Sequence, residues 1–197
     1  MFTKLIGEYK TLRKNKRLEP IFDTSVFIII TFAIHYLYRY WEIEFDYRIF
    51  GFQLLTPAIF DWFTNALFNH SKWLMSHFLH FTTSTRTFNF ENNSSVKIVF
   101  SCSGIQQMLQ FALLILLYPG PWKHKTWYIP MGAILIHLTN VIRISGLCIV
   151  MANWPNHWKF AHDYPFRIIF YVVIFFLWVI WNDRFYHQQS KAKVQQT

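Results

Sequence analysis

The chain has 197 residues and a net charge of +9, with 53% hydrophobic, 21% aromatic and only 15% charged residues. Soluble domains carry about 25% charged residues, so this composition excludes a disordered chain, a coiled coil and an ordinary water-soluble domain. Two cysteines exclude a disulfide scaffold or a cysteine-rich metal module. We therefore predict an all-α integral membrane protein whose basic residues face anionic lipid, with no nucleic-acid partner.

Four stretches are apolar enough to cross the hydrocarbon core, which takes about 20 residues of helix. These stretches are residues 21–38, 103–118, 127–151 and 164–182. A basic tail, residues 1–20, precedes the first of them and is predicted to be cytoplasmic. Because no small-residue cleavage site follows the first stretch, we interpret it as an uncleaved anchor. Pro119-Gly120-Pro121 is a strong stop signal at the end of the second.

Residues 57–81 predict an amphipathic helix that lies in the membrane interface. Polar residues recur there at steps of three and four, which places them on one stripe: Asp61, Asn65, Asn69, Lys72, Ser76 and His80. The opposite face is apolar and carries Ile59, Phe63, Leu67, Leu74 and Phe78. The alternative is a fifth span, with the polar stripe buried against the other helices.

Residues 85–100 predict a short extracytoplasmic β-hairpin, because the apolar period changes there to two. Phe88 and Phe90 alternate with polar residues before the turn cluster 92–95, and Val96 and Ile98 alternate after it. Asn92-Asn93-Ser94 also fits a glycosylation sequon, which we interpret as a chance match in a tight turn. The hairpin delivers the chain to Cys102.

The distribution of Lys and Arg predicts that both termini are cytoplasmic. With this orientation the inner segments, 1–20, 119–126 and 184–197, hold 11 Lys or Arg in 42 residues. The outer segments, 39–98 and 152–163, hold 6 in 72. A fifth span at 57–81 would add an odd crossing and spoil this agreement.

Cys102 lies at the outer end of the second span. Ser103 and Gln106 form a capping-box pattern, which predicts that a helix begins one residue after the cysteine. A thiol at a helix N-terminus is favoured as thiolate, and Gly104 would allow a substrate to approach the backbone. The plainer interpretation is a small buried hydrophobic residue.

Two further polar residues, Arg143 and His162, lie where lipid would penalise them. Arg143 is inside the third span, where an ionised guanidinium needs a partner or a water-lined cavity, and Asn140 shares its face. His162 precedes the fourth span, with Asp163 as the expected N-cap. The plainer alternatives are an arginine snorkelling to the headgroups and an ordinary histidine at the membrane rim.

The predicted topology brings Cys102, Arg143 and His162 to the same face of the membrane. Attack by a thiolate on an acyl group needs a proton donor or acceptor and a group that stabilises the oxyanion. These three residues can fill those roles.

The three motifs together resemble the exosortase/archaeosortase family, in its short form from Bacteroidetes-type bacteria. They are Ser101-Cys102-Ser103-Gly104-Ile105, Asn140-Val141-Ile142-Arg143-Ile144 and Ala161-His162-Asp163-Tyr164, within about residues 90–180. The resemblance implies a multispanning enzyme of the bacterial inner membrane, with no cofactor or metal. Its substrates would be exported proteins with a C-terminal sorting signal. The chain has fewer spans before the cysteine than larger members.

We therefore predict a membrane cysteine transpeptidase or protease with Cys102, Arg143 and His162 as catalytic residues. Ser103, Gly104, Asn140 and Asp163 would support them or the substrate. Cys148 is expected to be a packing residue, and His70, His77 and His80 are a weak alternative metal site. The rival hypothesis is a non-enzymatic membrane scaffold or assembly partner, which would need no thiol beside an arginine and a histidine.

Overall fold

The computed structural model describes residues 19–45, 48–49, 52–53, 57–118 and 120–186 and is mainly helical. The chain divides into two compact units, residues 1–46 and 47–197. The first unit consists, in its described part, of one long helix, α2 (Glu19–Phe45), which contains the predicted first span.

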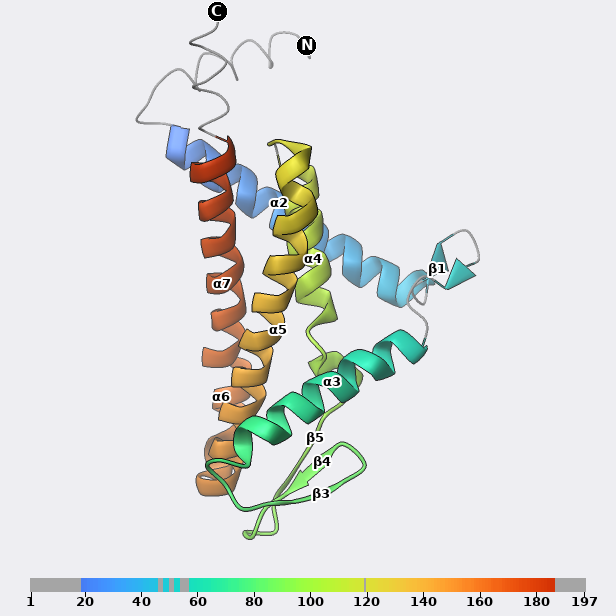
Figure 1. The fold of residues 1–197 in the computed structure, drawn as a ribbon, viewed down its shortest axis with the longest axis vertical. Coiled ribbons are helices and arrows are strands. Elements are labelled where there is room, and N and C mark those ends of the chain that lie inside the picture. The colour runs from blue at the N-terminus through green and yellow to red at the C-terminus, as the bar shows by residue number, and fades with distance from the viewer. Residues whose placement is uncertain (1–18, 46–47, 50–51, 54–56, 119, 187–197) are drawn as a thin grey trace, which may run out of the picture. The chain divides into compact units, whose positions relative to one another are not determined.

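The second unit holds all other elements (Figure 1). In chain order these are β1 (Arg48–Ile49), β2 (Phe52–Gln53), α3 (Pro57–Met75), β3 (Thr82–Ser84), β4 (Thr87–Asn89), β5 (Ser95–Lys97), the 3-10 helix η1 (Phe100–Cys102), α4 (Ile105–Leu117), α5 (Trp122–Asn153), the 3-10 helix η2 (Pro155–His157), α6 (Trp158–Asp163), α7 (Pro165–Trp181) and the π-helical turn η3 (Asn182–Tyr186).

Helices α4, α5 and α7 run side by side as a bundle, and α3 lies across it (Figure 1). The turn between α4 and α5 is tied by Lys125, whose Nζ donates to the carbonyls of Leu116 and Tyr118, both at 2.8 Å. Carbonyls at a helix C-terminus lack partners within the helix, and a cation there is also attracted by the negative end of the helix dipole. This buried lysine therefore caps α4.

Two helical stretches of the described residues are long and apolar enough to cross a membrane, Trp122–Asn153 and Pro155–Phe185. They contain the predicted third and fourth spans. The predicted second span is α4, which has 13 residues and is therefore about 20 Å long, shorter than a hydrocarbon core of roughly 30 Å. The described residues thus hold two candidate membrane-spanning helices, and the predicted count of four spans is not confirmed.

The polar stripe predicted on α3 is exposed along its whole length: Asp61, Asn65, Asn69, Lys72, and beyond the helix Ser76 and His80. The buried face is formed instead by Thr64, Leu67, Ser71 and Met75, which pack toward the bundle. The predicted apolar face is therefore only partly right, since Ile59 and Phe78 are exposed. A stripe in solvent favours the interfacial helix over a fifth span.

The predicted hairpin is present as β4 and β5, which pair antiparallel with Phe88 opposite Val96. A third strand, β3, pairs with β4 and extends the hairpin to a three-stranded sheet. The tip of the hairpin is held by Asn92, whose Nδ2 donates to the carbonyls of Met151 and Ala152 at the end of α5.

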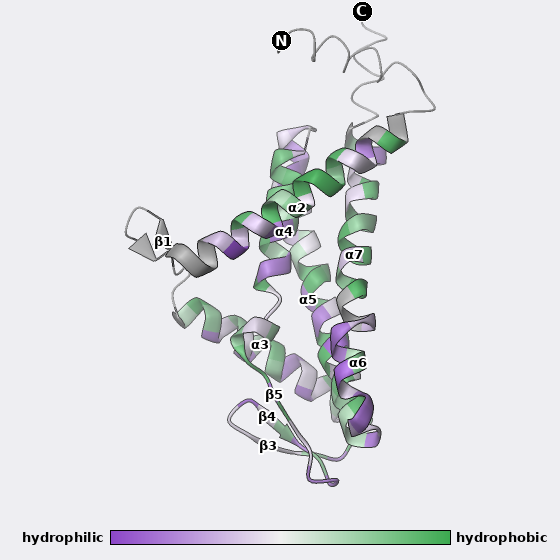
Figure 2. Ribbon diagram, turned by 180° about the vertical axis from the view of Figure 1, so that it is seen from behind, coloured by the Kyte–Doolittle hydropathy of each residue, from purple (hydrophilic) through white to green (hydrophobic). Residues whose placement is uncertain are grey.

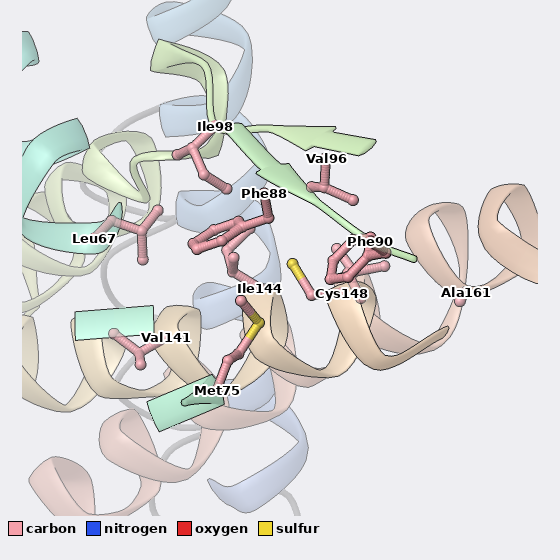
Figure 3. Close-up of a cluster of buried hydrophobic side chains, with 11 residues drawn as sticks. Leu67, Met75, Phe88, Phe90, Val96, Ile98, Val141, Ile144, Cys148 and Ala161 are labelled. Carbon is pink, nitrogen blue, oxygen red and sulfur yellow. The ribbon is translucent and has the colours of Figure 1, made fainter. Parts of the chain in front are cut away.

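The core at this end of the bundle lies between α3, the sheet and the C-terminal half of α5 (Figure 3). Phe88 and Val96 point inward from the sheet, and Ile144 and Cys148 point toward them from α5. The apolar residues that alternate in the hairpin and those that recur with helical period in α3 and α5 therefore pack together in one apolar cluster. This cluster fixes the sheet, and the chain that leaves it, against α5.

Candidate active site

Cys102 is the last residue of η1, a single 3-10 turn that follows β5, and its side chain is partly exposed. The turn is closed by hydrogen bonds from the Cys102 N–H to the Val99 carbonyl and from the Ser103 N–H to the Phe100 carbonyl, both 2.9 Å. Helix α4 begins at Ile105 with Gly104 as its N-cap. The predicted capping box is therefore wrong: Ser103 is buried, and its Oγ accepts a long 3.4 Å bond from the Ile105 N–H.

Gly104 allows this chain reversal because its φ is +80°, in the left-handed region that side chains disfavour. A Cβ at this position would also lie 2.8 Å from Nδ2 of Asn140. The glycine therefore serves the approach of α5 to the cysteine turn. The approach of a substrate to the backbone at Gly104 stays a prediction.

Asn140 joins the cysteine turn to α5. It is fully buried, and its Nδ2 donates a 2.7 Å hydrogen bond to the backbone carbonyl of Cys102. Its Oδ1 accepts a bond of 3.4 Å from Nη1 of Arg143, one helical turn further on. A single buried amide thus fixes the backbone of the cysteine and orients the arginine.

Arg143 lies between α5 and α7. Its guanidinium carbon is 5.5 Å from the ring centroid of Phe170 on α7, within the range of a cation–π contact. It therefore packs within the bundle, as the presence of Asn140 on its face had suggested, and it is half-buried.

His162 lies on α6, and its contacts there fix its ring. Nδ1 is 3.0 Å from Oδ1 of Asp163, and the ring stacks on Trp158 with centroids 5.8 Å apart. Asp163 is not the N-cap of the last span, which is Tyr164 with Pro165 following it. When Nδ1 donates to the carboxylate, a neutral His162 keeps Nε2 as a proton acceptor.

The structure thus links Cys102, Gly104, Asn140 and Arg143 directly. His162 lies on α6, which packs against α5 and carries several hydrophilic residues (Figure 2). The hydrogen bond and the stacking contact described for His162 are within α6. The convergence of all three predicted catalytic side chains on one cleft stays a prediction.

Two aromatic residues of this region were missed by sequence reasoning. Phe170 carries no polar signal and is one of many aromatic residues in α7, so nothing marked it as the partner of Arg143. Trp158 could have been found, because it precedes His162 by four residues and such pairs meet on one helix face.

The remaining candidates separate from this group. Cys148 is fully buried in the apolar cluster, as its predicted packing role requires. His70 bonds to His137 of α5 at 2.9 Å, whereas His77 bonds to the carbonyl of Trp73. Within the described residues, no three His, Cys, Asp or Glu side chains are grouped to hold a metal ion.

Comparison with known proteins agrees with the motifs. Residues 27–179, more than half of the chain, match the family model described as Transmembrane exosortase. No curated protein and no solved structure is significantly similar to the chain.

Proposed function

The chain belongs to the transmembrane exosortase family, and from this membership we propose that it is a cysteine transpeptidase or protease of the bacterial inner membrane. It cleaves C-terminal sorting tails of exported proteins on the outer side of the membrane. The observation that carries the proposal is the hydrogen bond from Asn140 to the carbonyl of Cys102, because it ties the partly exposed thiol to the helix that holds Arg143. A scaffold needs no thiol beside an arginine and a histidine.

The proposed reaction begins when the Cys102 thiolate attacks a backbone carbonyl carbon of the tail. The carbonyl oxygen becomes an oxyanion, which the Arg143 guanidinium stabilises. The intermediate collapses to a thioester as the C–N bond breaks, and His162 gives its proton to the leaving amine. An amine acceptor or water then attacks the thioester and loses a proton to His162, and the C–S bond breaks to release the acylated product and the Cys102 thiolate.

Ser103, Gly104, Asn140 and Asp163 act on these three residues and not on the substrate in this scheme. Gly104 and Asn140 hold the cysteine turn, and Ser103 is buried below it. Asp163 orients the His162 ring through Nδ1, which leaves Nε2 for the proton.

The test compares Cys102→Ala with Cys148→Ala in cells that express reporters, each ending in the C-terminal segment of one exported protein of the same organism. We expect Cys102→Ala to abolish cleavage of at least one reporter, because the nucleophile is gone. Cys148→Ala should keep cleavage, since that thiol is only packed. Trapping of a thioester between Cys102 and the reporter is the direct readout. Equal processing by the parent and by Cys102→Ala would favour the scaffold.

A further inference from the structure

A groove about 330 Å³ in volume lies between α3 and the strand β3. Its walls are Asn65, Phe68 and Asn69 from α3, and residues 83–86 from the end of β3 and the turn that follows. We call it the α3–β3 groove. Its volume falls at the lower end of ligand sites, which measure about 300–1,000 Å³.

The lining of the groove is polar and nearly uncharged. Two side-chain amides face hydroxyl groups of threonine and serine residues, and its one cation, Arg86, forms a 2.8 Å ion pair with Asp61. Phe68 supplies an apolar floor and stacks on Phe88 beneath it, with ring centroids 4.7 Å apart. Amides and hydroxyls match the hydrogen-bonding groups of a peptide main chain, and they do not match a lipid tail.

One wall of the groove is a strand edge. Among the described strands, β3 pairs with β4 alone, and its three residues are all exposed. The outer edge of such a strand presents backbone N–H and C=O groups that an added strand can pair with. Domains that bind extended peptides commonly use this mode, in which main-chain bonds give affinity and neighbouring pockets read alternate side chains.

The elements that form the two walls of the groove also contact the segment that carries Cys102. On the α3 side, Phe60 contacts Phe100 of the cysteine turn, with ring centroids 4.0 Å apart. On the strand side, the carbonyl of Arg86 accepts a 2.8 Å bond from the N–H of Ile98, four residues before the cysteine. From Asn69 to Asp61 the stripe on α3 covers about 12 Å, the length of about four residues of extended chain.

We propose that the α3–β3 groove binds an extended segment of the substrate, within a few residues of the bond that Cys102 attacks, as an additional strand on β3. The inference rests on the proposed function for the identity of the substrate. It gives the exposed polar stripe of α3 a role that lying in the membrane interface does not require.

The experiment uses disulfide cross-linking in the full-length chain with Cys102 replaced by alanine, so that no turnover occurs. Ser84→Cys places a thiol in the groove, and Ser95→Cys places one on the exposed face of β5 at the other edge of the sheet. Both changes replace the same residue type. Each variant is oxidised with every reporter described above, carrying single cysteines at successive positions of its tail. Thr83→Cys repeats the groove arm in case Ser84→Cys folds poorly.

We expect Ser84→Cys to cross-link several-fold more than Ser95→Cys, and at alternate tail positions, because successive side chains of a strand point to opposite sides. Adding Asn69→Leu should remove most of this yield. If the parent cleaves a reporter that the groove thiols cross-link no better than Ser95→Cys, the groove proposal is wrong and the proposed function stands. If the groove thiols cross-link in the alternating pattern but the parent never cleaves, the groove proposal stands and the transpeptidase does not.

Discussion

At the scale of single residues, Gly104 and Asn140 constrain each other. The buried amide can reach the Cys102 carbonyl only because no side chain stands at position 104. The left-handed backbone of Gly104 turns the chain from η1 into α4 at the same point. Two separate requirements, conformational and steric, therefore fall on one glycine.

Replacing Gly104 with alanine should lower reporter cleavage strongly. An alanine with positive φ costs about 1 kcal/mol or more, and its Cβ would stand 2.8 Å from Nδ2 of Asn140, so that the amide must move away from the cysteine turn. The measurement is the rate of reporter cleavage at matched protein levels. Gly146→Ala, in the middle of α5, is the control and should keep the rate, since alanine is a better helix former than glycine. Equal rates for the two variants would contradict the role given to Gly104.

Much of the candidate site could be predicted at this scale, because lipid makes misplaced polar residues conspicuous. Cys102, Asn140 and Arg143 were selected from their places in apolar surroundings, and the structure connects them. The capping details could not be predicted. Ser103 fits a capping box by spacing. Gly104, however, adopts a left-handed conformation that serine disfavours, and the helix begins at Ile105 with Gly104 as its N-cap.

At the scale of elements, the tight connection between α4 and α5 depends on one buried cation. Lys125 is 4% exposed, and its ammonium group bonds to two carbonyls at the end of α4 while it lies over the Trp122 ring. From the sequence, Lys125 is only one of the basic residues of the predicted inner segment 119–126. Its structural role depends on where α4 ends, because it bonds to the last carbonyls of that helix. The Pro-Gly-Pro signal predicts this end, but the number of basic residues in the segment does not.

Lys125→Met should destabilise the protein, whereas Lys123→Met should not. Methionine keeps much of the length and the apolar stem but leaves the carbonyls of Leu116 and Tyr118 without their donor. Hydrogen bonds to charged groups contribute about 2 kcal/mol, so a clear drop in the melting temperature in detergent is expected. Lys123 is the matched control because it is exposed and lies two residues away. Equal melting temperatures would show that the cap contributes nothing.

Some of these elements could be predicted from the sequence and others could not. The hairpin emerged from its period of two, and the exposed stripe of α3 from its period of three to four. The third strand β3 could not be predicted, because its Thr-Thr-Ser sequence shows no alternation of apolar and polar residues. This strand forms by pairing with β4, to which it is joined by a tight turn at residues 85–86.

At the scale of the whole molecule, the imbalance of Lys and Arg predicts how the chain is oriented in the membrane. Both termini and the α4–α5 turn are rich in these residues, and the segment between α5 and α7 is poor in them. Lys123, in the first turn of α5, and Asn156, just beyond its C-terminal end, are both exposed and so report the direction of this helix.

Single cysteines at these two positions, Lys123→Cys and Asn156→Cys, should react differently with an impermeant maleimide in intact cells. In a background without the native cysteines, we expect labelling at 156 and not at 123, because the positive-inside rule predicts that the basic end of α5 faces the cytoplasm. Permeabilised cells provide the control, in which both positions should react. Labelling at 123 alone in intact cells would reverse the orientation and place the cysteine turn inside.

The length of α5 also determines the depth of the arginine. With 32 residues the helix is about 48 Å long, more than the 40–45 Å of a bilayer with its headgroups. When Trp127, the first residue of the predicted span, sits at the inner edge of the hydrocarbon, Arg143 is about 24 Å further along the axis, roughly 6 Å short of the opposite edge. A side chain as long as arginine extends over that distance to the outer headgroups, while its packing on Phe170 shields it from lipid. An acceptor amine or a water molecule could reach a thioester at that level by diffusion, without a channel through the protein.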